Sequence, residues 1–421
     1  MYQSDFPIFT THPDLIYLDN ASTTQKPQYV IDRVDHYITH DYANIHRGIY
    51  DLAEQSELLY EQSKKMTAKH LGCHWSQLIY HYNATACANM LVDLLIHNKV
   101  VWPWDTVRVG LRDHHATIVP RQLMAERIGC RIEYIPFDAQ TYDMDREWVE
   151  ERVQNAELRI QNTDEKSKNL THQNSKTPKA CFVCHASNVT GQIYDVARLR
   201  GLLWDDVFVA VDASQSVPHF PVDVMTIGCD ALFFTAHKMM AYTWLGILYL
   251  TKKYIQSRSP TQGGGGIIDT VTTDGCSLQV GVSRFEPGTP NLIAAVSLLA
   301  AWEYIEQIGG YKVLQAHEHI LTLYCLDNFA QRPWITLVGS DDVSVRTSTF
   351  SLSLPCISPL VVWEYLASQG ICVRGGGHCA HPLLHHLGYD HGVIRMSLGL
   401  SNTREDCEKF FSALDDFHAS T

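Results

Sequence analysis

A lysine and an aspartate stand at the ends of two strongly apolar runs in the middle of the chain. Asp212 follows the run 207–211, and Lys238 comes shortly after the run 231–234. An ammonium group at the end of a buried strand is costly unless it is paired or neutralised. A Schiff base between the lysine and pyridoxal phosphate is one chemical solution, and such sites also place an acid on the pyridine nitrogen of the cofactor. Asp212 is in position to be that acid.

More polar side chains follow other apolar runs of the chain. The residues concerned are Thr85, His114, Asn188, Asp212 with Gln215, and His237 with Lys238. In an open parallel sheet, ligands bind outside the carboxyl ends of the strands. A single polar residue after a strand means little, but several clusters with complementary groups predict one shared site at that edge of the sheet.

The elements that would position these residues alternate along the chain. Apolar runs predict strands near residues 78–82, 106–109, 131–135, 207–211 and 231–234, and helical spacing predicts helices near 83–96 and 119–128. Such alternation is typical of an α/β fold, in which helices cover both faces of a mostly parallel sheet.

The composition shifts along the chain predict an arm and two domains. Residues 1–20 form an extended arm that ends in a short strand and packs with the small domain, 21–291 form a large cofactor-binding domain, and 292–421 form a smaller α+β domain. Within the large domain, 155–179 is polar and lacks apolar periodicity, which predicts a surface insertion. Thr403 and Asp406 have the spacing of a capping box at the start of the C-terminal helix.

Composition places the chain among ordinary globular proteins. It has 421 residues, 45% hydrophobic and 19% charged, and a formal net charge of −13. Lysine and arginine are scattered, so we expect no nucleic-acid partner. We see no signal peptide and no run of about 18 apolar residues, so we expect no membrane span. The 12 cysteines are irregularly spaced and are expected to be reduced thiols in the cytoplasm.

Several motifs together resemble those of a known enzyme family. They are Tyr17-Leu-Asp-Asn-Ala21, His46-Arg-Gly48, Asp113-His-His115, His185-Ala-Ser-Asn188, Val211-Asp-Ala-Ser-Gln215, Thr235-Ala-His-Lys238, Arg284-Phe-Glu-Pro-Gly-Thr-Pro-Asn291 and Arg374-Gly-Gly-Gly-His-Cys-Ala380. The chain resembles the class V, fold-type I pyridoxal-phosphate enzymes, and within them the SufS/CsdA-like (type II) cysteine desulfurases and selenocysteine lyases. This implies a PLP-transferase fold of type I, with a seven-stranded, mostly parallel sheet in the large domain.

The resemblance assigns roles around the cofactor. Lys238 would carry the Schiff base and then move the Cα proton, and Asp212 would keep the pyridine nitrogen protonated. His114 would stack on the ring, with Gln215 near the phenolic oxygen and Asn188 beside it.

The phosphate and the dimer are also implied by the resemblance. Thr85, Thr235 and His237 would hold the phosphate. Thr289 would reach the phosphate of a neighbouring subunit, which implies a homodimer with composite sites.

The resemblance further implies a reaction at sulfur. The thiolate of Cys379 would attack the sulfur of L-cysteine, leaving a persulfide on the enzyme and releasing L-alanine. Nearby positive groups would favour the thiolate, and Arg374 and His378 are close in sequence. Arg395 would pair with the substrate carboxylate. The other implied substrate contacts are Arg374, Asn188, Ala21 and His46. The sulfur would pass to a SufE/SufU-type acceptor protein for iron–sulfur cluster assembly.

Two segments depart from the family pattern. The turn after the lysine, usually rich in Gly and Pro, is bulkier here at 239–244. The phosphate loop before the first long helix keeps one threonine, Thr85, where two are usual. These departures predict weaker or different phosphate binding.

Other interpretations stay open at this point. Selenocysteine lyase activity, an aminotransferase-like or kynureninase-like reaction with Cys379 as a bystander, and a non-enzymatic scaffold are the alternatives. Cys181-Phe-Val-Cys184-His185 matches a haem-attachment pattern, and histidines between 378 and 391 are numerous enough to bind zinc. We expect neither a haem nor a designed metal site.

Overall fold

A seven-stranded sheet forms the centre of the computed structural model, which describes residues 2–46, 48–151 and 178–420. Its strand order is β2-β8-β7-β6-β5-β3-β4. The strands are β2 (Leu78–His81), β3 (Thr106–Gly110), β4 (Arg131–Ile135), β5 (Pro178–Cys184), β6 (Phe208–Asp212), β7 (Ala231–Thr235) and β8 (Gly246–Leu250). Only β8 runs against its neighbours, so the predicted mostly parallel sheet is confirmed.

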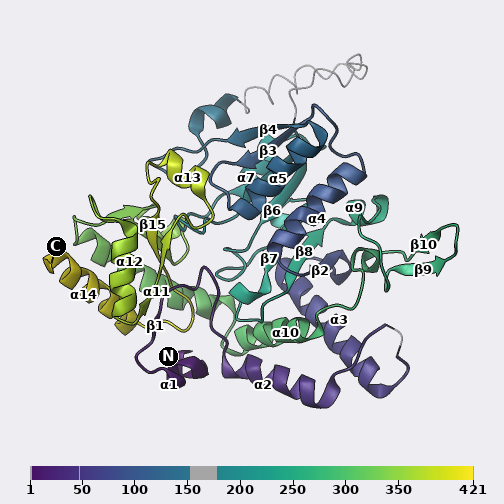
Figure 1. The fold of residues 1–421 in the computed structure, drawn as a ribbon, viewed down its shortest axis with the longest axis horizontal. Coiled ribbons are helices and arrows are strands. Elements are labelled where there is room, and N and C mark those ends of the chain that lie inside the picture. The colour runs from purple at the N-terminus through teal and green to yellow at the C-terminus, as the bar shows by residue number, and fades with distance from the viewer. Residues whose placement is uncertain (1, 47, 152–177, 421) are drawn as a thin grey trace.

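Helices cover both faces of this sheet (Figure 1). Every residue of β6 and β7 is buried, as expected for strands enclosed on two sides. One face packs against α4 (Ala84–His97) and α5 (His115–Ile128). The other face packs against α3 (Asp51–Leu71) and α10 (Leu292–Gln307), with α2 (Gln28–His36) and α7 (Val196–Leu202) adding to the same core. The predicted α/β class is therefore confirmed.

Shorter elements complete this part of the chain. They are α8 (Val224–Ile227), α9 (Lys252–Ser257) and the hairpin of β9 (Ile268–Val271) and β10 (Cys276–Leu278), which projects from the body in Figure 1.

A second, antiparallel sheet of four strands lies beside the first one (Figure 1). Its order is β11 (Thr336–Val338), β12 (Thr349–Ser353), β15 (Val393–Ser397) and β14 (Arg374–Gly376). Helices α11 (Tyr311–Ala330), α12 (Pro359–Ser368) and α14 (Arg404–Ser420) share its core, and α13 (His381–His386) follows β14. The predicted capping box is confirmed, because Thr403 N donates to Asp406 and Asp406 N donates to Thr403 Oγ1.

The N-terminal arm differs from the extended conformation that we predicted. Residues 2–5 and α1 (Pro7–Thr11) are helical, and Phe6 packs edge-on against Tyr304 of α10 at 6.3 Å. Only its end is extended: β1 (Ile16–Tyr17) pairs in parallel with β13 (Ile371–Cys372). The short helix was not predicted because it packs against α10, which is far away in the sequence.

The predicted start of the small domain at residue 292 conflicts with the packing of α10. This helix shares the core of the seven-stranded sheet, and so do Tyr311 and Leu314 at the start of α11. Leu321 and Cys325, further along α11, belong to the core of the four-stranded sheet. We therefore propose a boundary inside α11. Of the predicted insertion 155–179, residues 178 and 179 begin β5, and the rest lies outside the described residues.

The described residues give no support to the haem pattern. Cys181 and Cys184 lie three apart on β5, so their side chains point to opposite faces of the sheet, and both are buried. No group of three or more His, Cys, Asp or Glu suited to a metal ion occurs within 2–46, 48–151 and 178–420.

In the same ranges, no single helix is long and apolar enough to cross a membrane. The pair α10 and α11 passes by length and composition, but it bends by 77° and α10 is largely buried in the protein core.

Candidate active site

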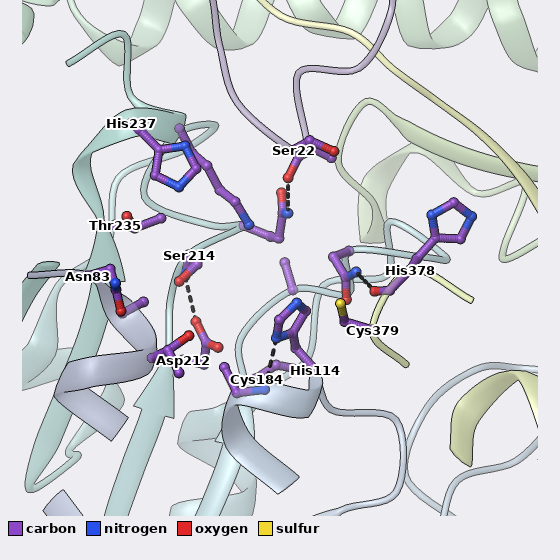
Figure 2. A pocket seen from close by; sticks show the side chains of 18 of the residues that line it. Ser22, Asn83, His114, Cys184, Asp212, Ser214, Thr235, His237, His378 and Cys379 are labelled. Atoms are coloured by element: carbon purple, nitrogen blue, oxygen red, sulfur yellow. Dashed lines mark hydrogen bonds between the residues drawn. The ribbon is translucent and has the colours of Figure 1, made fainter. Parts of the chain in front are cut away.

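A cavity of about 870 Å³, counted to where it opens to solvent, lies at the carboxyl ends of the central strands. Figure 2 shows His237, Thr235 and Asn83 on one side of it, Cys379 and His378 on the opposite side, and Asp212 and His114 between them. Most of the predicted site residues line this cavity: Ala21, Thr85, His114, Asn188, Asp212, Gln215, Thr235, His237, Lys238, Arg374, Cys379 and Arg395. Residues from both sheets therefore meet in one space.

Lys238 ends a short 3₁₀ turn directly after β7. Burial lowers the pKa of its ammonium group to about 8, although Asp212 acts in the opposite direction. Asp212 closes β6, and its two carboxylate oxygens accept hydrogen bonds from Ser214 N at 2.9 Å and Thr117 Oγ1 at 3.4 Å. The pair thus combines an amine that is partly neutral near physiological pH with a fixed carboxylate.

This lowered pKa makes a prediction for the cofactor-free protein. Only a neutral amine attacks an aldehyde, so the rate at which added pyridoxal phosphate becomes attached should rise with pH and level off above a midpoint near 8. An ordinary lysine would give a midpoint near 10.5. Stopped-flow absorbance measures the rate. In Asp212→Asn the midpoint should fall further, because Asp212 raises the pKa; a wild-type midpoint above 10 would contradict the prediction.

The side of the cavity that holds Asn83 is suited to an anion. Helix α4 begins there, and Asn83 caps it by accepting a hydrogen bond from Ala86 N at 2.8 Å. Amide groups of a helix N-terminus attract phosphate, and Thr85 adds a hydroxyl from the first turn. Burial lowers the pKa of His237 to about 4, so this ring contributes a neutral hydrogen-bonding group rather than a charge.

His114 is the N-cap of α5, and its Nδ1 accepts a hydrogen bond from Ala116 N at 3.0 Å. Burial, together with Lys238, lowers the pKa of His114 to about 4. The ring is therefore neutral, and its proton is on Nε2, the nitrogen that does not accept the cap bond. A neutral imidazole is able to lie against a cationic ring system without charge repulsion.

Cys379 lies on a backbone segment of unusual conformation. His378 and Cys379 have φ angles of 47° and 55°, a left-handed region that costs non-glycine residues about 1–3 kcal/mol each. Two hydrogen bonds hold them: Asn188 Nδ2 donates to His378 O at 2.8 Å, and His115 N donates to Cys379 O at 2.7 Å. The thiol itself is exposed to the cavity.

The prediction that His378 supplies positive charge next to this thiol is wrong. Burial lowers the pKa of His378 to about 3, with Arg395 acting in the same direction. Its Nε2 donates to Val393 O at 3.0 Å, so the ring is a neutral support of the loop. Positive charge in this part of the cavity comes from Arg374 and Arg395.

Arg395 is almost completely buried on β15 and is already paired. Its Nη2 donates to Asp19 Oδ1 at 2.9 Å and to Ser22 Oγ at 2.6 Å, and its Nη1 donates to Asn188 O at 3.0 Å. Arg374 is half exposed and contacts the other oxygen of Asp19 at 3.2 Å. Within the described part of the chain, Nε is the one guanidinium nitrogen of Arg395 without a partner. Bidentate binding of a carboxylate therefore requires one of these contacts to rearrange.

Two predicted site residues do not line this cavity. Thr289 lies in a separate pocket of about 550 Å³ together with Trp244 and Tyr82. His46 is placed outside as well, with its Nδ1 3.4 Å from Glu57 Oε1. Their assignments as cofactor and substrate contacts stay predictions.

Comparison with protein families decides the assignment. The model of the family described as aminotransferase class-V matches residues 16–410. The chain belongs to this family. Class-V aminotransferases use pyridoxal phosphate as their cofactor.

Three curated relatives of this class-V chain are named as cysteine desulfurases or probable cysteine desulfurases. A cysteine desulfurase of Escherichia coli O127:H6 is 30% identical over 425 residues, covering 99% of this chain and 97% of its own length. A probable cysteine desulfurase of Streptomyces coelicolor is 32% identical over 427 residues, covering 98% of this chain and 95% of its own. The chain spans only 57% of the probable cysteine desulfurase of Mycolicibacterium paratuberculosis, which is 32% identical.

Solved structures agree with the fold. The apo cysteine desulfurase of Thermococcus onnurineus superposes with a TM-score of 0.89 at 28% identity, covering 100% of this chain and 98% of its own. The Escherichia coli cysteine desulfurase CsdA gives 0.82 at 26% identity, covering 99% and 97%. The predicted PLP-transferase fold of type I is confirmed.

The residues of this class-V site fit the cofactor. Ser214 Oγ is buried at the cavity wall and has no hydrogen-bond partner among the described residues, and the same holds for Arg395 Nε. A buried amine, a fixed carboxylate and a helix N-terminus are placed at three parts of one cavity. These are the groups needed for the aldehyde, the pyridine nitrogen and the phosphate of pyridoxal phosphate.

Several residues of the site were missed in the sequence. Asp19 was seen only as part of a motif, yet it pairs with both arginines. Ser22 and Ser214 also line the cavity. Asp19 and Ser22 flank Ala21, so the motif at 17–21 was a usable signal, but no pattern in the sequence indicated which arginine would meet it.

Proposed function

We propose that this protein is a cysteine desulfurase that converts L-cysteine to L-alanine and takes the sulfur onto Cys379. One observation carries the proposal: an exposed thiol on a held, left-handed loop shares a cavity with Lys238 and Asp212. An aminotransferase needs the lysine and the acid but has no use for a thiol at that place. The names of the curated relatives support the same activity.

In this proposal, bound pyridoxal phosphate supplies an electron sink for the carbon next to the substrate amine. Lys238, buried and partly neutral, removes the proton from that carbon. Asp212 would hold a proton on the ring nitrogen, and His114 would supply a neutral imidazole beside the ring. The Cys379 thiolate then forms an S–S bond to the substrate sulfur while the C–S bond breaks. The electron pair of that bond goes to the carbon, which is protonated to become the methyl group of alanine.

The substrate carboxylate is bound by Arg395 in this proposal, with Arg374 near it. Arg395→Lys should raise KM for L-cysteine by about 10- to 100-fold with a smaller change in kcat. The reason is that the ammonium group of lysine cannot replace the paired hydrogen bonds of the planar guanidinium group. Steady-state alanine production gives both constants. Arg374→Lys is the matched control at a half-exposed position, and its KM should change by less than about fivefold. Equal effects of the two substitutions would contradict the assignment.

The proposal extends to partners. Trp244 and Tyr82 are 64% and 61% exposed at the pocket that contains Thr289. A second copy of the chain that covers these rings would bring Thr289 to the phosphate of its own site, which gives a homodimer. We further propose a SufE/SufU-type protein as sulfur acceptor, iron–sulfur cluster assembly as the use of the sulfur, and the cytoplasm as the location.

Incubation with L-cysteine and pyridoxal phosphate tests the function. Alanine and protein-bound persulfide should form together, and one persulfide should form per active site before any acceptor thiol is added. If alanine formed only after addition of pyruvate, as acceptor of the amino group, and no persulfide formed, the protein would catalyse a different class-V reaction. Repeating the assay with L-selenocysteine measures the preference between the two chalcogens, and a higher kcat/KM for selenium would make the protein a selenocysteine lyase.

A further inference from the structure

Arg121 on α5 is fully buried, with 0% of its surface exposed, and it makes no salt bridge among the described residues. Its Nη1 donates to Ala116 O at 3.4 Å, while Nε and Nη2 have no hydrogen-bond partner in residues 2–46, 48–151 and 178–420. The guanidinium lies over the ring of Phe182 at 3.6 Å. Burial lowers the pKa of Arg121 to about 9, which leaves it charged at neutral pH. Such a charge is costly to bury unless other charges compensate it.

The helix places Arg121 on the same face as two residues of the site. His114, Thr117 and Arg121 have the spacing i, i+3 and i+7, which is one face of a helix. His114 lines the cavity, and Thr117 donates to Asp212. Arg121 is therefore one helical turn below the residue that contacts the Asp212 carboxylate.

The strand under this helix gives the same position independently. Phe182 and Cys184 lie two apart on β5, so they point to the same face, and Cys184 is paired in register with Asp212 on β6. Since the guanidinium of Arg121 packs on Phe182, it is displaced from Asp212 by two residues along the strand direction, which is about 7 Å towards the N-terminal end of β5.

Two buried carboxylates face this guanidinium. Asp212 is 6% exposed, and Asp113 is fully buried. Asp113 Oδ1 accepts a hydrogen bond from Cys184 N at 3.0 Å, but no residue that the structure describes is a hydrogen-bond partner of its Oδ2. Burial raises the pKa of Asp113 to about 6, and the negative charge of Asp212 adds to this shift. Two neighbouring buried carboxylates repel each other, and a positive charge nearby offsets that repulsion.

We propose that Arg121 is a positioning residue for the proposed reaction: its buried positive charge compensates the negative charge of the Asp212 carboxylate, the group that would bind the pyridine nitrogen of the cofactor. The inference rests on the proposed role of Asp212 as the acid at that nitrogen. Arg112 also faces Asp113, but its guanidinium is held 3.3 Å from the ring of Tyr194. Arg121 is further from the ring nitrogen than Asp212 is, so its repulsion of a ring cation is the smaller effect.

A double-mutant cycle tests this through cofactor affinity, without any turnover. The variants are Arg121→Met, which keeps the length and the contact with Phe182, Asp212→Asn, and both together. The dissociation constant of pyridoxal phosphate is measured on each cofactor-free protein by fluorescence titration. Arg121→Met should weaken binding about tenfold in the wild-type background but less than about twofold in Asp212→Asn. Arg121→Lys should restore the affinity to within about threefold.

The other outcomes are equally decisive. Equal weakening in both backgrounds, or none in either, overturns the role of Arg121 and leaves that of Asp212 intact. If Asp212→Asn alone leaves both the affinity and the visible spectrum of the bound cofactor unchanged, the proposed role of Asp212 fails first, and the inference fails with it. Melting curves show which variants are folded, and Arg121→Gln replaces Arg121→Met in the cycle if the latter does not fold.

Discussion

Cys379→Ala is expected to eliminate persulfide formation and to slow alanine release from L-cysteine by at least about 10³-fold. Among the residues that the structure describes, no other thiol lines the cavity at a place open to the substrate. Cys184, which also lines it, is buried and its pKa is raised well above the ordinary value by burial, so it cannot replace the missing thiolate. The visible spectrum of the bound cofactor should be unchanged. Alanine is measured by chromatography and the persulfide by mass spectrometry of the intact protein.

The control for this experiment is another exposed cysteine. Cys276 lies on the projecting β9–β10 hairpin, away from the cavity-lining residues, and Cys276→Ser should keep full activity and full persulfide labelling. If Cys379→Ala produced alanine at the wild-type rate, the thiol would be a bystander, and the assignment as a desulfurase acting through Cys379 would be wrong.

Lys238→Ala is expected to remove both the covalent attachment of the cofactor and the proton transfer. We expect alanine formation to fall by about 10³-fold or more, since one residue performs two chemical tasks. After denaturation and desalting of the borohydride-reduced protein, no cofactor mass should stay on the chain. Non-covalent affinity for pyridoxal phosphate should persist, because Asp212 and the α4 N-terminus are unchanged.

The matched lysine is Lys252, which is exposed at the start of α9. Lys252→Ala should behave like the wild type in both measurements. Cofactor mass attached to the reduced Lys238→Ala protein would show that another amine carries the Schiff base. The partly buried Lys26, whose pKa burial also lowers to about 8, would then be the first to examine.

The main features of the fold could be predicted because they follow from local patterns. Runs of apolar residues marked β6 and β7, and their polar ends located Asp212 and Lys238. The capping box at Thr403 was visible for the same reason. The helix α1 and the packing of α10 were not visible, since both depend on contacts made far away in the sequence.

The residue types of the site were predicted better than their electrostatic states. His378 was expected to be cationic, but burial lowers the pKa of its ring and makes it neutral. The extent of burial cannot be inferred from a local sequence motif. Asp19 and Arg395 are separated by 376 residues, so their ion pair could not be found from spacing. Arg121 gave no signal at all, because an arginine in a helix is usually at the surface.

The loop that carries Cys379 follows β14 of the four-stranded sheet. The carbonyl groups of His378 and Cys379 nevertheless accept hydrogen bonds from residues next to the seven-stranded sheet, Asn188 and His115 respectively. A hinge motion between the two sheets would therefore have to break both bonds or carry the loop along with the larger body. In the proposed function, transfer of sulfur from Cys379 to an acceptor would accordingly depend on rotation about the Cα–Cβ bond of this residue. The proposed acceptor would then have to bring its own thiol into the mouth of the cavity, which favours a partner whose cysteine lies at the tip of a narrow protruding loop.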